Sequence, residues 1–374
     1  MEFVPVNEPL LDGNEKKYLT ECIDTGWISS EGPFVARLEE GMARRCGRKF
    51  GIAVCNGSVA LDVAVAALGL GPGDEVILPT FTIISCAQAI TRACATPVVV
   101  DSDPLTWNMD VEQVAASITP RTRAIMVVHI YGLPVDMDPI LALAAKHGLK
   151  IIEDTAEVIG QTYRGRPCGG FGNISTLSFY PNKHVTTGEG GMVLTDDAAL
   201  AERCRSLRNL CFQKKRFVHD ELGWNFRMSN LQAAIGVAQM ERLEEFIAIK
   251  RRMGARYTEL LVGTRGIQLP LARTDYAENI YWVFGVVLDD DIPFDSDEAM
   301  KRLAAAGVGT RPFFYPMHEQ PAFRRMGLFA DVHCPVAERI ARRGFYIPSG
   351  LNLTGRQIEQ SASILRSLLG QSST

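Results

Sequence analysis

The stretch around which this chain is organised is Ser178-Phe179-Tyr180-Pro181-Asn182-Lys183-His184-Val185-Thr186-Thr187-Gly188-Glu189-Gly190-Gly191. It carries one lysine between an apolar run and a glycine-rich turn, after which residues 192–194 predict another strand. A lysine on a tight loop between two buried strands is partly desolvated, so more of it is the nucleophilic amine. Such a lysine suits an imine with a carbonyl cofactor. The ordinary alternative is a loop lysine in solvent.

The glycines of this turn favour the first interpretation. Gly188, Gly190 and Gly191 fall within four consecutive positions of this stretch. Glycine lets other groups approach the backbone closely, so this density indicates that backbone and a ligand come together here.

The composition is that of a globular protein with two domains. The chain has 374 residues, of which 47% are apolar and 22% charged, enough for a large core. The net charge is −4 and no long block of like charge is present. We therefore expect neither nucleic acid nor a membrane surface as a partner.

The cysteines and the N-terminus suggest a cytoplasmic location. Nine cysteines are scattered singly without a CxxC pair, which indicates free thiols in a reducing compartment. Residues 1–5 do not resemble a signal peptide, and the most apolar window, 53–70, is too polar and short for a membrane span. No two histidines have the spacing of metal ligands, so we expect no metal.

The first half of the chain alternates between short apolar runs and helical patterns. After helices at 14–24 and 34–46, strands are expected at 51–54, 75–78, 97–100, 124–130 and 149–153, and helices at 59–68, 85–93, 111–118 and 138–147. Nearly all-apolar strands separated by helices predict a mostly parallel sheet that is buried on both faces, an α/β fold. Ligands bind at the carboxyl ends of such strands.

The pattern changes after residue 191. We expect a helix at 198–207, an irregular stretch at 208–228 and one long helix from 230 to about 257. A strand at 282–288 and helices at 297–306 and 357–368 then indicate a smaller α+β lobe. The predicted domains are a large one over 1–245, with an N-terminal arm, and a small one over 246–374.

Two groups near strand ends are candidates for binding a charged ligand. Asn56-Gly57-Ser58 precedes an apolar helix, and a helix N-terminus binds phosphate well; the alternative is plain N-capping. Asp154 follows a buried strand, where its carboxylate needs a cation or hydrogen-bond donors. A protonated pyridine nitrogen would serve, and the alternative is a helix cap. Together with Lys183, these groups form what a pyridoxal-phosphate site on an α/β sheet requires.

These residues resemble the DegT/DnrJ/EryC1/StrS family of sugar aminotransferases, and the resemblance covers nearly the whole chain. It rests on residues 27–30 with Gly32, 56–58, 153–157, 178–191, 225–230 and 311–318. It implies the pyridoxal-phosphate-dependent transferase fold of type I, the aspartate-aminotransferase type, with a mostly parallel central sheet flanked by helices and a smaller C-terminal α+β domain. It also implies pyridoxal phosphate as cofactor, L-glutamate as amino donor and a nucleotide-linked 4-keto-6-deoxysugar as acceptor.

The resemblance implies a role for each matching position. Lys183 would bind the cofactor covalently and move the proton, Asp154 would pair with the pyridine nitrogen, and Glu157 would lie near the ring hydroxyl. The phosphate would be held by Gly57, Ser58 and Ser178, with Asn225 reaching it from the partner subunit of a homodimer whose active sites lie at the interface. Contacts with the nucleotide sugar are expected from Trp27, Ser29, His129, His184, Arg227, Tyr315 and His318.

Within the family, the residues at 12–15, 128–132, 186–192 and 311–318 are most similar to enzymes that aminate GDP-4-keto-6-deoxymannose. That similarity implies deoxysugar biosynthesis, as for the O-antigen of lipopolysaccharide. The chain departs from it at Leu133, Pro181 and His184, close to the expected sugar. A UDP- or dTDP-linked ketosugar is therefore the alternative substrate.

One more departure concerns the cofactor ring, and two alternatives concern the class of protein. Ile83 stands where the family usually places a Tyr or Trp over the ring, so aromatic stacking is lost unless Phe81 replaces it.

The related sugar dehydratases replace the lysine by histidine, whereas Lys183 is present here. A regulatory relative without catalysis would need a DNA-binding surface, and the sequence contains no basic patch or helix pair of that kind.

Overall fold

A seven-stranded sheet forms the centre of the molecule. The computed structural model describes residues 2–215 and 217–370. The strand order is β1-β9-β8-β5-β4-β2-β3. These strands are β1 (Phe50–Val54), β2 (Glu75–Pro79), β3 (Thr96–Val100), β4 (Thr122–Val128), β5 (Lys150–Asp154), β8 (Ile174–Ser178) and β9 (Gly191–Thr195). β9 runs antiparallel to both of its neighbours, while the pairs from β8 to β3 are parallel. The predicted mostly parallel sheet is confirmed.

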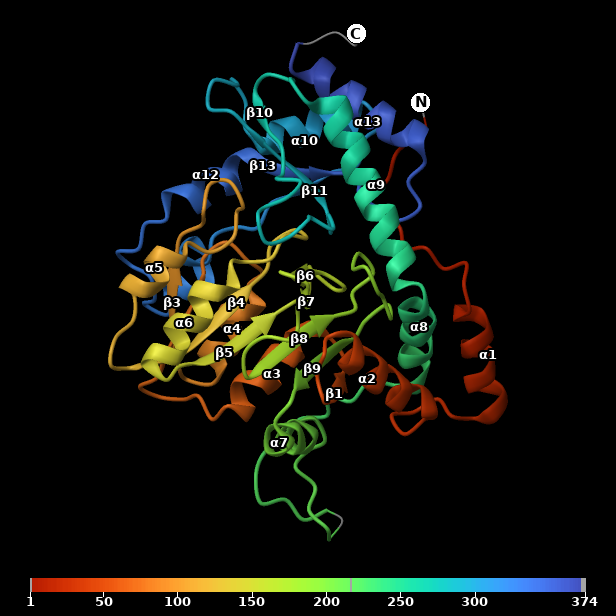
Figure 1. The fold of residues 1–374 in the computed structure, drawn as a ribbon, viewed down its shortest axis with the longest axis vertical. Helices are drawn as coiled ribbons and strands as arrows, with labels where there is room; N and C mark the ends of the chain where they lie inside the picture. Colours follow the sequence, from red (N-terminus) through yellow and green to blue (C-terminus); the bar gives the residue numbers. More distant parts are fainter. Residues whose placement is uncertain (1, 216, 371–374) are drawn as a thin grey trace.

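Helices cover both faces of this sheet (Figure 1). Along β4, Met126 faces the cluster that includes α3 and α4, while Ile125 and Val127 face the cluster on the opposite side. Alternate residues are therefore apolar on both faces, which is why the strands are apolar throughout. The helices of this part are α1 (Glu15–Thr25), α2 (Pro33–Arg45), α3 (Gly57–Ala67), α4 (Ser85–Arg92), α5 (Val111–Ala116), α6 (Met137–His147), α7 (Ala198–Arg208) and α8 (Asn230–Glu241).

A second lobe carries its own antiparallel sheet, in the order β10-β11-β13-β12. Its strands are β10 (Ile267–Gln268), β11 (Phe284–Leu288), β12 (Arg311–Pro312) and β13 (Gly344–Ile347). The helices are α9 (Leu243–Leu261), α10 (Ser296–Ala305), the 3-10 turn η1 (Met317–Glu319), α11 (Pro321–Arg325), α12 (Pro335–Arg343) and α13 (Gly355–Leu368). A short hairpin, β6 (Thr162–Tyr163) with β7 (Arg166–Pro167), lies in the chain between β5 and β8 of the large sheet.

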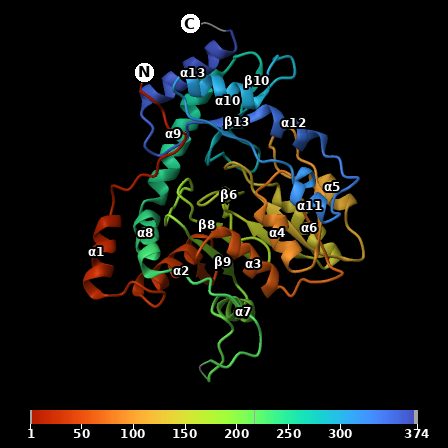
Figure 2. The same cartoon turned by 180° about the vertical axis from the view of Figure 1, so that it is seen from behind.

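α9 leads from the large sheet to the second lobe, as both views show (Figures 1 and 2). We propose that the domains divide at 245/246, near the start of this helix. The first residues of the chain belong in space to the second lobe, because Val4 forms a bridge with Val308 and Ser349 donates its N–H to the Val6 carbonyl at 2.8 Å. The N-terminal arm therefore crosses from one lobe to the other.

The predicted unbroken helix from 230 to 257 is wrong. α8 ends at Glu241 and α9 begins at Leu243, with Arg242 between them at φ −110° and ψ 10°. Gln239 donates to the Leu10 carbonyl at 2.8 Å and Arg242 pairs with Asp12, so contacts with the N-terminal segment fix the break. Helical periodicity alone does not reveal such a break, because it depends on a segment far away in the chain.

Two further properties bear on function. All nine cysteines are free thiols, as the sequence predicts. Within residues 2–215 and 217–370, no helix combines the length and the hydropathy needed to cross a bilayer.

Candidate active site

Three loops open at one edge of the large sheet. β5 and β8 are parallel and place Asp154 opposite Thr176. Because β9 is antiparallel, its first residue, Gly191, pairs with both Val54 and Ser178. The chain segments that follow β1, β5 and β8 therefore emerge side by side, and they carry the phosphate-cradle candidate, Asp154 and the lysine loop.

The glycines allow the lysine loop to lie against the start of α3. A Cβ atom on Gly57 would lie 2.6 Å from the Ser178 Cβ, and one on Gly191 would lie 2.5 Å from the Asn56 carbonyl oxygen. Gly188 has φ +79°, which favours glycine. These glycines let the loop pack against the end of β8 and the start of α3, and the approach of a ligand to this backbone stays a prediction.

These loops enclose a cavity of about 580 Å³. Seven of the residues predicted to bind the cofactor line it together: Gly57, Ser58, Ile83, Asp154, Glu157, Ser178 and Lys183. Asn225 is exposed and lies outside this lining. The walls also include side chains that sequence reasoning missed: Tyr180, Asn182, Trp282, Phe314 and Tyr346.

Lys183 lines this cavity, and its side chain is only 9% exposed. Its Nζ lies 3.9 Å from Glu157 Oε1 and 3.6 Å from the centre of the Trp282 ring. Burial lowers the pKa of Lys183, while the carboxyl groups of Glu157 and Asp154 act in the opposite direction. Burial also raises the pKa of Glu157 to about 8, although Lys183 opposes that shift. Burial therefore favours the uncharged amine that a nucleophilic lysine needs.

Asp154 is a buried carboxyl group that lines the cavity. It accepts hydrogen bonds from the Ala156 N–H at 3.0 Å and from the Cys86 thiol at 3.4 Å. Burial raises its pKa. Among the described residues, no lysine or arginine forms an ion pair with it. A protonated pyridine nitrogen would supply the missing cation, so the carboxyl group fits that end of pyridoxal phosphate.

The N-terminus of α3 fits the other end of the cofactor. Asn56 caps this eleven-residue helix by accepting the Val59 N–H at 3.0 Å, so the capping interpretation is correct for Asn56. One cap leaves other first-turn N–H groups for an anion. Gly57, Ser58 and Ser178 line the cavity beside them, and Ser58 Oγ lies 2.7 Å from Ser85 Oγ. Amine, carboxyl group and helix N-terminus together fit pyridoxal phosphate.

The second lobe closes the cavity with aromatic side chains. Trp282, Phe314 and Tyr346 line it, and the Trp282 Nε1–H donates to the Asn182 carbonyl at 2.7 Å. The aromatic stretch at 311–318 is the only sequence signal that pointed here, yet Phe314 reaches the cavity and Tyr315 does not. Tyr315 is 54% exposed and outside the lining, so its predicted sugar contact stays a prediction.

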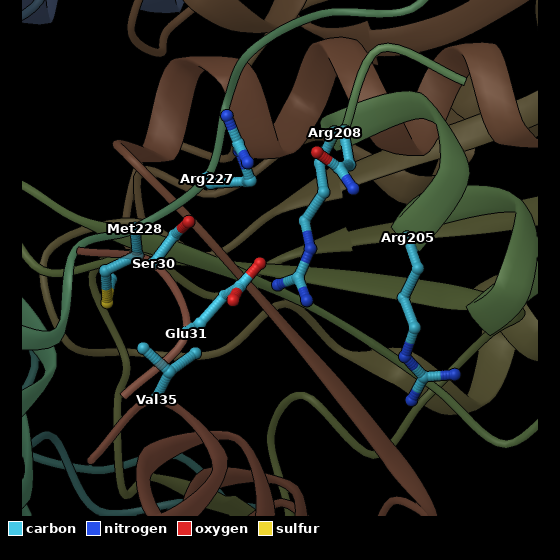
Figure 3. A pocket seen from close by; sticks show the side chains of 8 residues that line it. Ser30, Glu31, Val35, Arg205, Arg208, Arg227 and Met228 are labelled. Atoms are coloured by element: carbon cyan, nitrogen blue, oxygen red, sulfur yellow. The ribbon is translucent and has the colours of Figure 1, made fainter. Parts of the chain in front are cut away.

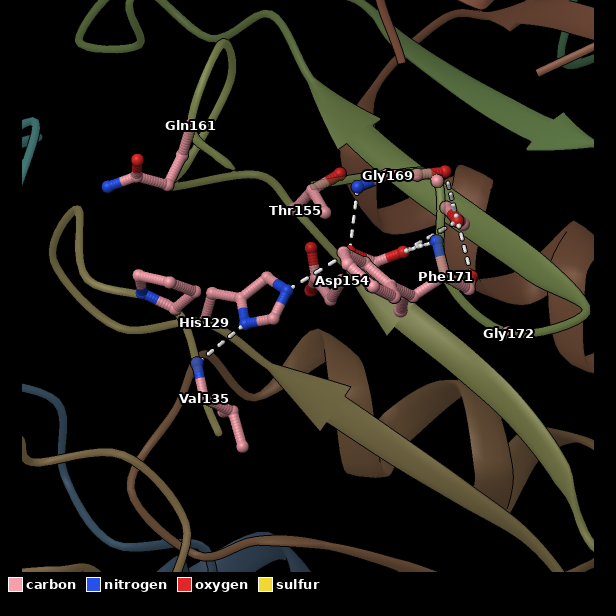
Figure 4. A network of polar contacts seen from close by, with 12 residues as sticks. His129, Val135, Asp154, Thr155, Gln161, Gly169, Phe171 and Gly172 are labelled. Carbon is pink, nitrogen blue, oxygen red and sulfur yellow. Dashed lines mark hydrogen bonds and ion pairs between the residues drawn. The ribbon is translucent and has the colours of Figure 1, made fainter. Parts of the chain in front are cut away.

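His129 is part of a buried polar network and does not line the cavity (Figure 4). The Val135 N–H donates to its Nδ1 at 3.0 Å, so its proton lies on Nε2, 3.1 Å from Glu153 Oε1. Glu153 also accepts the N–H groups of Gly169 and Phe171. Both ring nitrogens are used inside the fold, and the contact of His129 with the substrate stays a prediction.

Two other histidines are also buried away from the cavity. His184 donates from Nε2 to the Ile280 carbonyl at 3.2 Å, and burial lowers its pKa to about 3. His318 lies between Thr80 Oγ1 at 2.8 Å and Glu338 Oε1 at 3.0 Å. Both side chains have hydrogen-bond partners inside the fold, and the sugar contacts of His184 and His318 stay predictions.

Within residues 2–215 and 217–370, two groups of side chains have ligand atoms within 4.8 Å of one another, as a metal would require: His129, Glu153 and Cys168, and His318, Glu319 and Glu338. The histidine nitrogens of both groups already have protein partners. We assign no metal to either group.

Of the remaining candidates, Arg227 belongs to a second, smaller cavity of about 280 Å³ (Figure 3). Arg227 lines it with Ser30, Glu31 and two further arginines, and its Nε donates to Asn225 Oδ1 at 3.0 Å. In the preceding turn, Trp27 is 49% exposed and the Ser29 carbonyl accepts the Asn230 N–H. For Trp27, Ser29, Asn225 and Arg227, contact with substrate or with the partner's cofactor stays a prediction.

Comparison with known proteins agrees with this geometry. The DegT/DnrJ/EryC1/StrS aminotransferase family matches residues 9–366. GDP-perosamine synthase of Caulobacter vibrioides is 42% identical, over 98% of both chains. UDP-N-acetyl-3-dehydro-alpha-D-glucosamine 3-aminotransferase of Acidithiobacillus ferrooxidans is 40% identical, over 98% of this chain and 95% of that protein. The crystal structure of DesV from S. venezuelae superposes with a TM-score of 0.92 at 32% identity, over 99% of this chain and 100% of that one.

Proposed function

The chain belongs to the DegT/DnrJ/EryC1/StrS aminotransferase family. We propose that the enzyme transfers an amino group from L-glutamate to GDP-4-keto-6-deoxymannose in the cavity that Lys183 lines, called the Lys183 cavity below. The protein is a pyridoxal-phosphate-dependent nucleotide-sugar aminotransferase. The observation that carries this function is the meeting of Lys183, Asp154 and the α3 N-terminus in one cavity. Relatives named GDP-perosamine synthase support the choice of sugar.

The cofactor, when bound, supplies the electron sink that allows a proton and an amino group to change carbon atoms. The Asp154 carboxyl group would hold its pyridine nitrogen, and the α3 N-terminus with Ser58 and Ser178 would hold its phosphate. Lys183, kept partly uncharged by burial, would take a proton from the substrate carbon and return it. Trp282 would exclude water from the Lys183 amine, because its ring lies 3.6 Å from Nζ.

The choice of sugar is tested by offering three ketosugars in parallel. Purified enzyme with L-glutamate should aminate GDP-4-keto-6-deoxymannose faster than the UDP- and dTDP-linked ketosugars, as measured by mass spectrometry of the products. A faster reaction with a UDP-ketosugar would move the assignment toward the activity named for the Acidithiobacillus relative, which is 40% identical.

The assembly that completes the site is a homodimer in which Asn225 reaches the partner's cofactor. Asn225 is exposed and lies outside the Lys183 cavity of its own chain, and both facts support this arrangement. Mixing inactive Lys183→Ala with Asn225→Ala subunits should restore about a quarter of full activity, since half of the dimers are mixed and each then has one complete site. No recovery after subunit exchange would place Asn225 outside the partner's site.

The setting that we propose is the cytoplasm, where the nine cysteines would stay reduced. The product would enter the synthesis of a deoxysugar such as those of O-antigen lipopolysaccharide.

A further inference from the structure

A second lysine is buried near the active site and has no role in the function described so far. Lys250, on α9, is 1% exposed. Its Nζ donates to the Trp282 carbonyl at 2.9 Å and to the Ser349 carbonyl. Among the described residues, no carboxylate forms an ion pair with it, and burial alone lowers its pKa to about 7. An amine without an acidic partner is costly to bury, so we expect Lys250 to have a role that offsets this cost.

The two carbonyls that Lys250 binds belong to the segments that form the cavity wall. Trp282 precedes β11, and its side chain reaches into the cavity while its carbonyl points back to α9. Ser349 supports the same region from the other side, because its Oγ accepts the Phe284 N–H at 2.8 Å and donates to the Ile347 carbonyl at 2.7 Å. Lys250 therefore joins α9 to both segments at once.

The Trp282 side chain in turn contacts the lysine loop at two points. Its Nε1–H donates to the Asn182 carbonyl at 2.7 Å, and its ring lies 3.6 Å from Lys183 Nζ. His184, on the other side of Lys183, donates to the Ile280 carbonyl of the same segment. The chain at 280–284 is thus held against the lysine loop on one side and against Lys250 on the other.

We propose that Lys250 is a positioning residue for the reaction: by holding the Trp282 carbonyl, it fixes the indole that covers the Lys183 amine. This goes beyond the proposed function and rests on it only through the role of Lys183. A lysine suits this position because its ammonium offers three donors that can serve carbonyls from two directions.

The test compares Lys250→Met, which removes the donors and keeps the volume, with Lys250→Arg, which keeps donors. Tyr257→Phe is the matched control, since Tyr257 is also buried on α9 and donates to the Pro348 carbonyl at 3.0 Å without contacting Trp282. For each variant we would measure melting temperature, the affinity of the apoenzyme for pyridoxal phosphate, and the rate of the L-glutamate half-reaction against pH.

We expect Lys250→Met to slow the half-reaction by roughly 10-fold, to weaken cofactor binding and to shift the midpoint of the rate–pH profile. Lys250→Arg should recover most of the rate. Tyr257→Phe should lower the melting temperature and leave the rate and the profile unchanged. Equal kinetic losses in Lys250→Met and Tyr257→Phe would reduce Lys250 to a structural role and overturn the proposal.

A double-mutant cycle tests the route through the indole. Where Trp282 is already replaced by Leu, adding Lys250→Met should change the rate and the cofactor affinity little, because the indole that Lys250 positions is already absent. An undiminished loss in that background would overturn the proposal. If Lys250→Met does not fold, Lys250→Gln takes its place in the same cycle, since its shorter amide still donates to one carbonyl. Cofactor affinity needs neither amino donor nor sugar, so this readout stands even where the proposed substrates fail.

Discussion

Lys183 Nζ lies 3.6 Å from the centre of the Trp282 ring, so the loop after β8 meets the second lobe at the reacting amine. A ring face attracts the ammonium form, as do the carboxyl groups of Glu157 and Asp154. Burial acts against all three, and the pKa of Lys183 is lowered. Desolvation is the larger effect, which leaves this lysine better suited to nucleophilic and proton-transfer chemistry than an exposed one.

Replacing Lys183 by Ala should give a folded protein without turnover. The side chain is buried, and its loss leaves Glu157 free to take its neutral form, so we expect a melting temperature close to that of the wild type. In the proposed function the amine would bind the cofactor covalently and move the proton, so the rate should fall at least about a thousandfold. Turnover and circular dichroism on the same preparation check this, and substantial transamination by the variant would contradict it.

Glu157 should make the apoenzyme less stable as the pH rises. Its pKa is about 8 in the fold against 4.5 in the unfolded chain, so between these values the folded state binds more protons. Stability then falls with increasing pH across this window. Replacing Glu157 by Gln should remove the decline. The free energy of unfolding of the variant, relative to that of the wild type, should therefore rise by a few kcal/mol between pH 5 and pH 8, which is roughly what the pKa shift gives through proton linkage.

Glu338→Gln is the matched control for that experiment. The pKa of Glu338 is lowered, chiefly by the Cys334 N–H and with a contribution from His318. Its contribution to the pH dependence of stability therefore has the opposite sign to that of Glu157. That variant should lose stability relative to the wild type as the pH rises from acid values. Urea unfolding at several pH values measures both variants, and equal trends would refute the assignment for Glu157.

His129 should matter for stability and not for substrate affinity. Replacing it by Ala removes the Nε2–H donor to Glu153, a buried carboxyl group, and leaves the Val135 N–H without its acceptor. We expect a loss of about 1–3 kcal/mol in the free energy of unfolding with the KM for the nucleotide sugar within about twofold of the wild type. A large rise in KM at unchanged stability would return His129 to the substrate site.

The parts of the site that could be predicted from the sequence are those that depend on the order of strands. Asp154, the lysine loop and the start of α3 each follow a strand, and parallel strands bring their carboxyl ends to one edge. The pairing of Gly191 with Val54 and Ser178 completes this edge. A linear pattern contains enough information for such an arrangement.

The features that sequence patterns do not reveal are the direction in which a side chain points and the lobe that covers it. His129, His184 and His318 stand at plausible positions in the sequence, yet each is turned into the core and hydrogen-bonded there. Trp282 and Tyr346 reach the cavity only because the second lobe packs over it. No local periodicity encodes that packing.

Ile83 offers a test of how the cofactor ring is covered. It is 44% exposed and lines the cavity, where the family resemblance implies an aromatic side chain. Replacing Ile83 by Tyr should tighten pyridoxal phosphate binding by about 2- to 10-fold, the value of an aromatic pair, whereas Ile83→Leu should change it little. Titration of the apoenzyme measures this. Weaker binding by the Tyr variant would mean that Ile83 does not face the ring.

The most direct test of the central claim is a spectral titration of the purified holoenzyme. The account predicts a visible absorption band from the cofactor bound to Lys183, its loss when L-glutamate is added, and its return when GDP-4-keto-6-deoxymannose follows. Loss without return would keep the aminotransferase and exclude this sugar in favour of a UDP- or dTDP-linked one. A protein that shows no band after addition of pyridoxal phosphate would contradict the assignment of the Lys183 cavity itself.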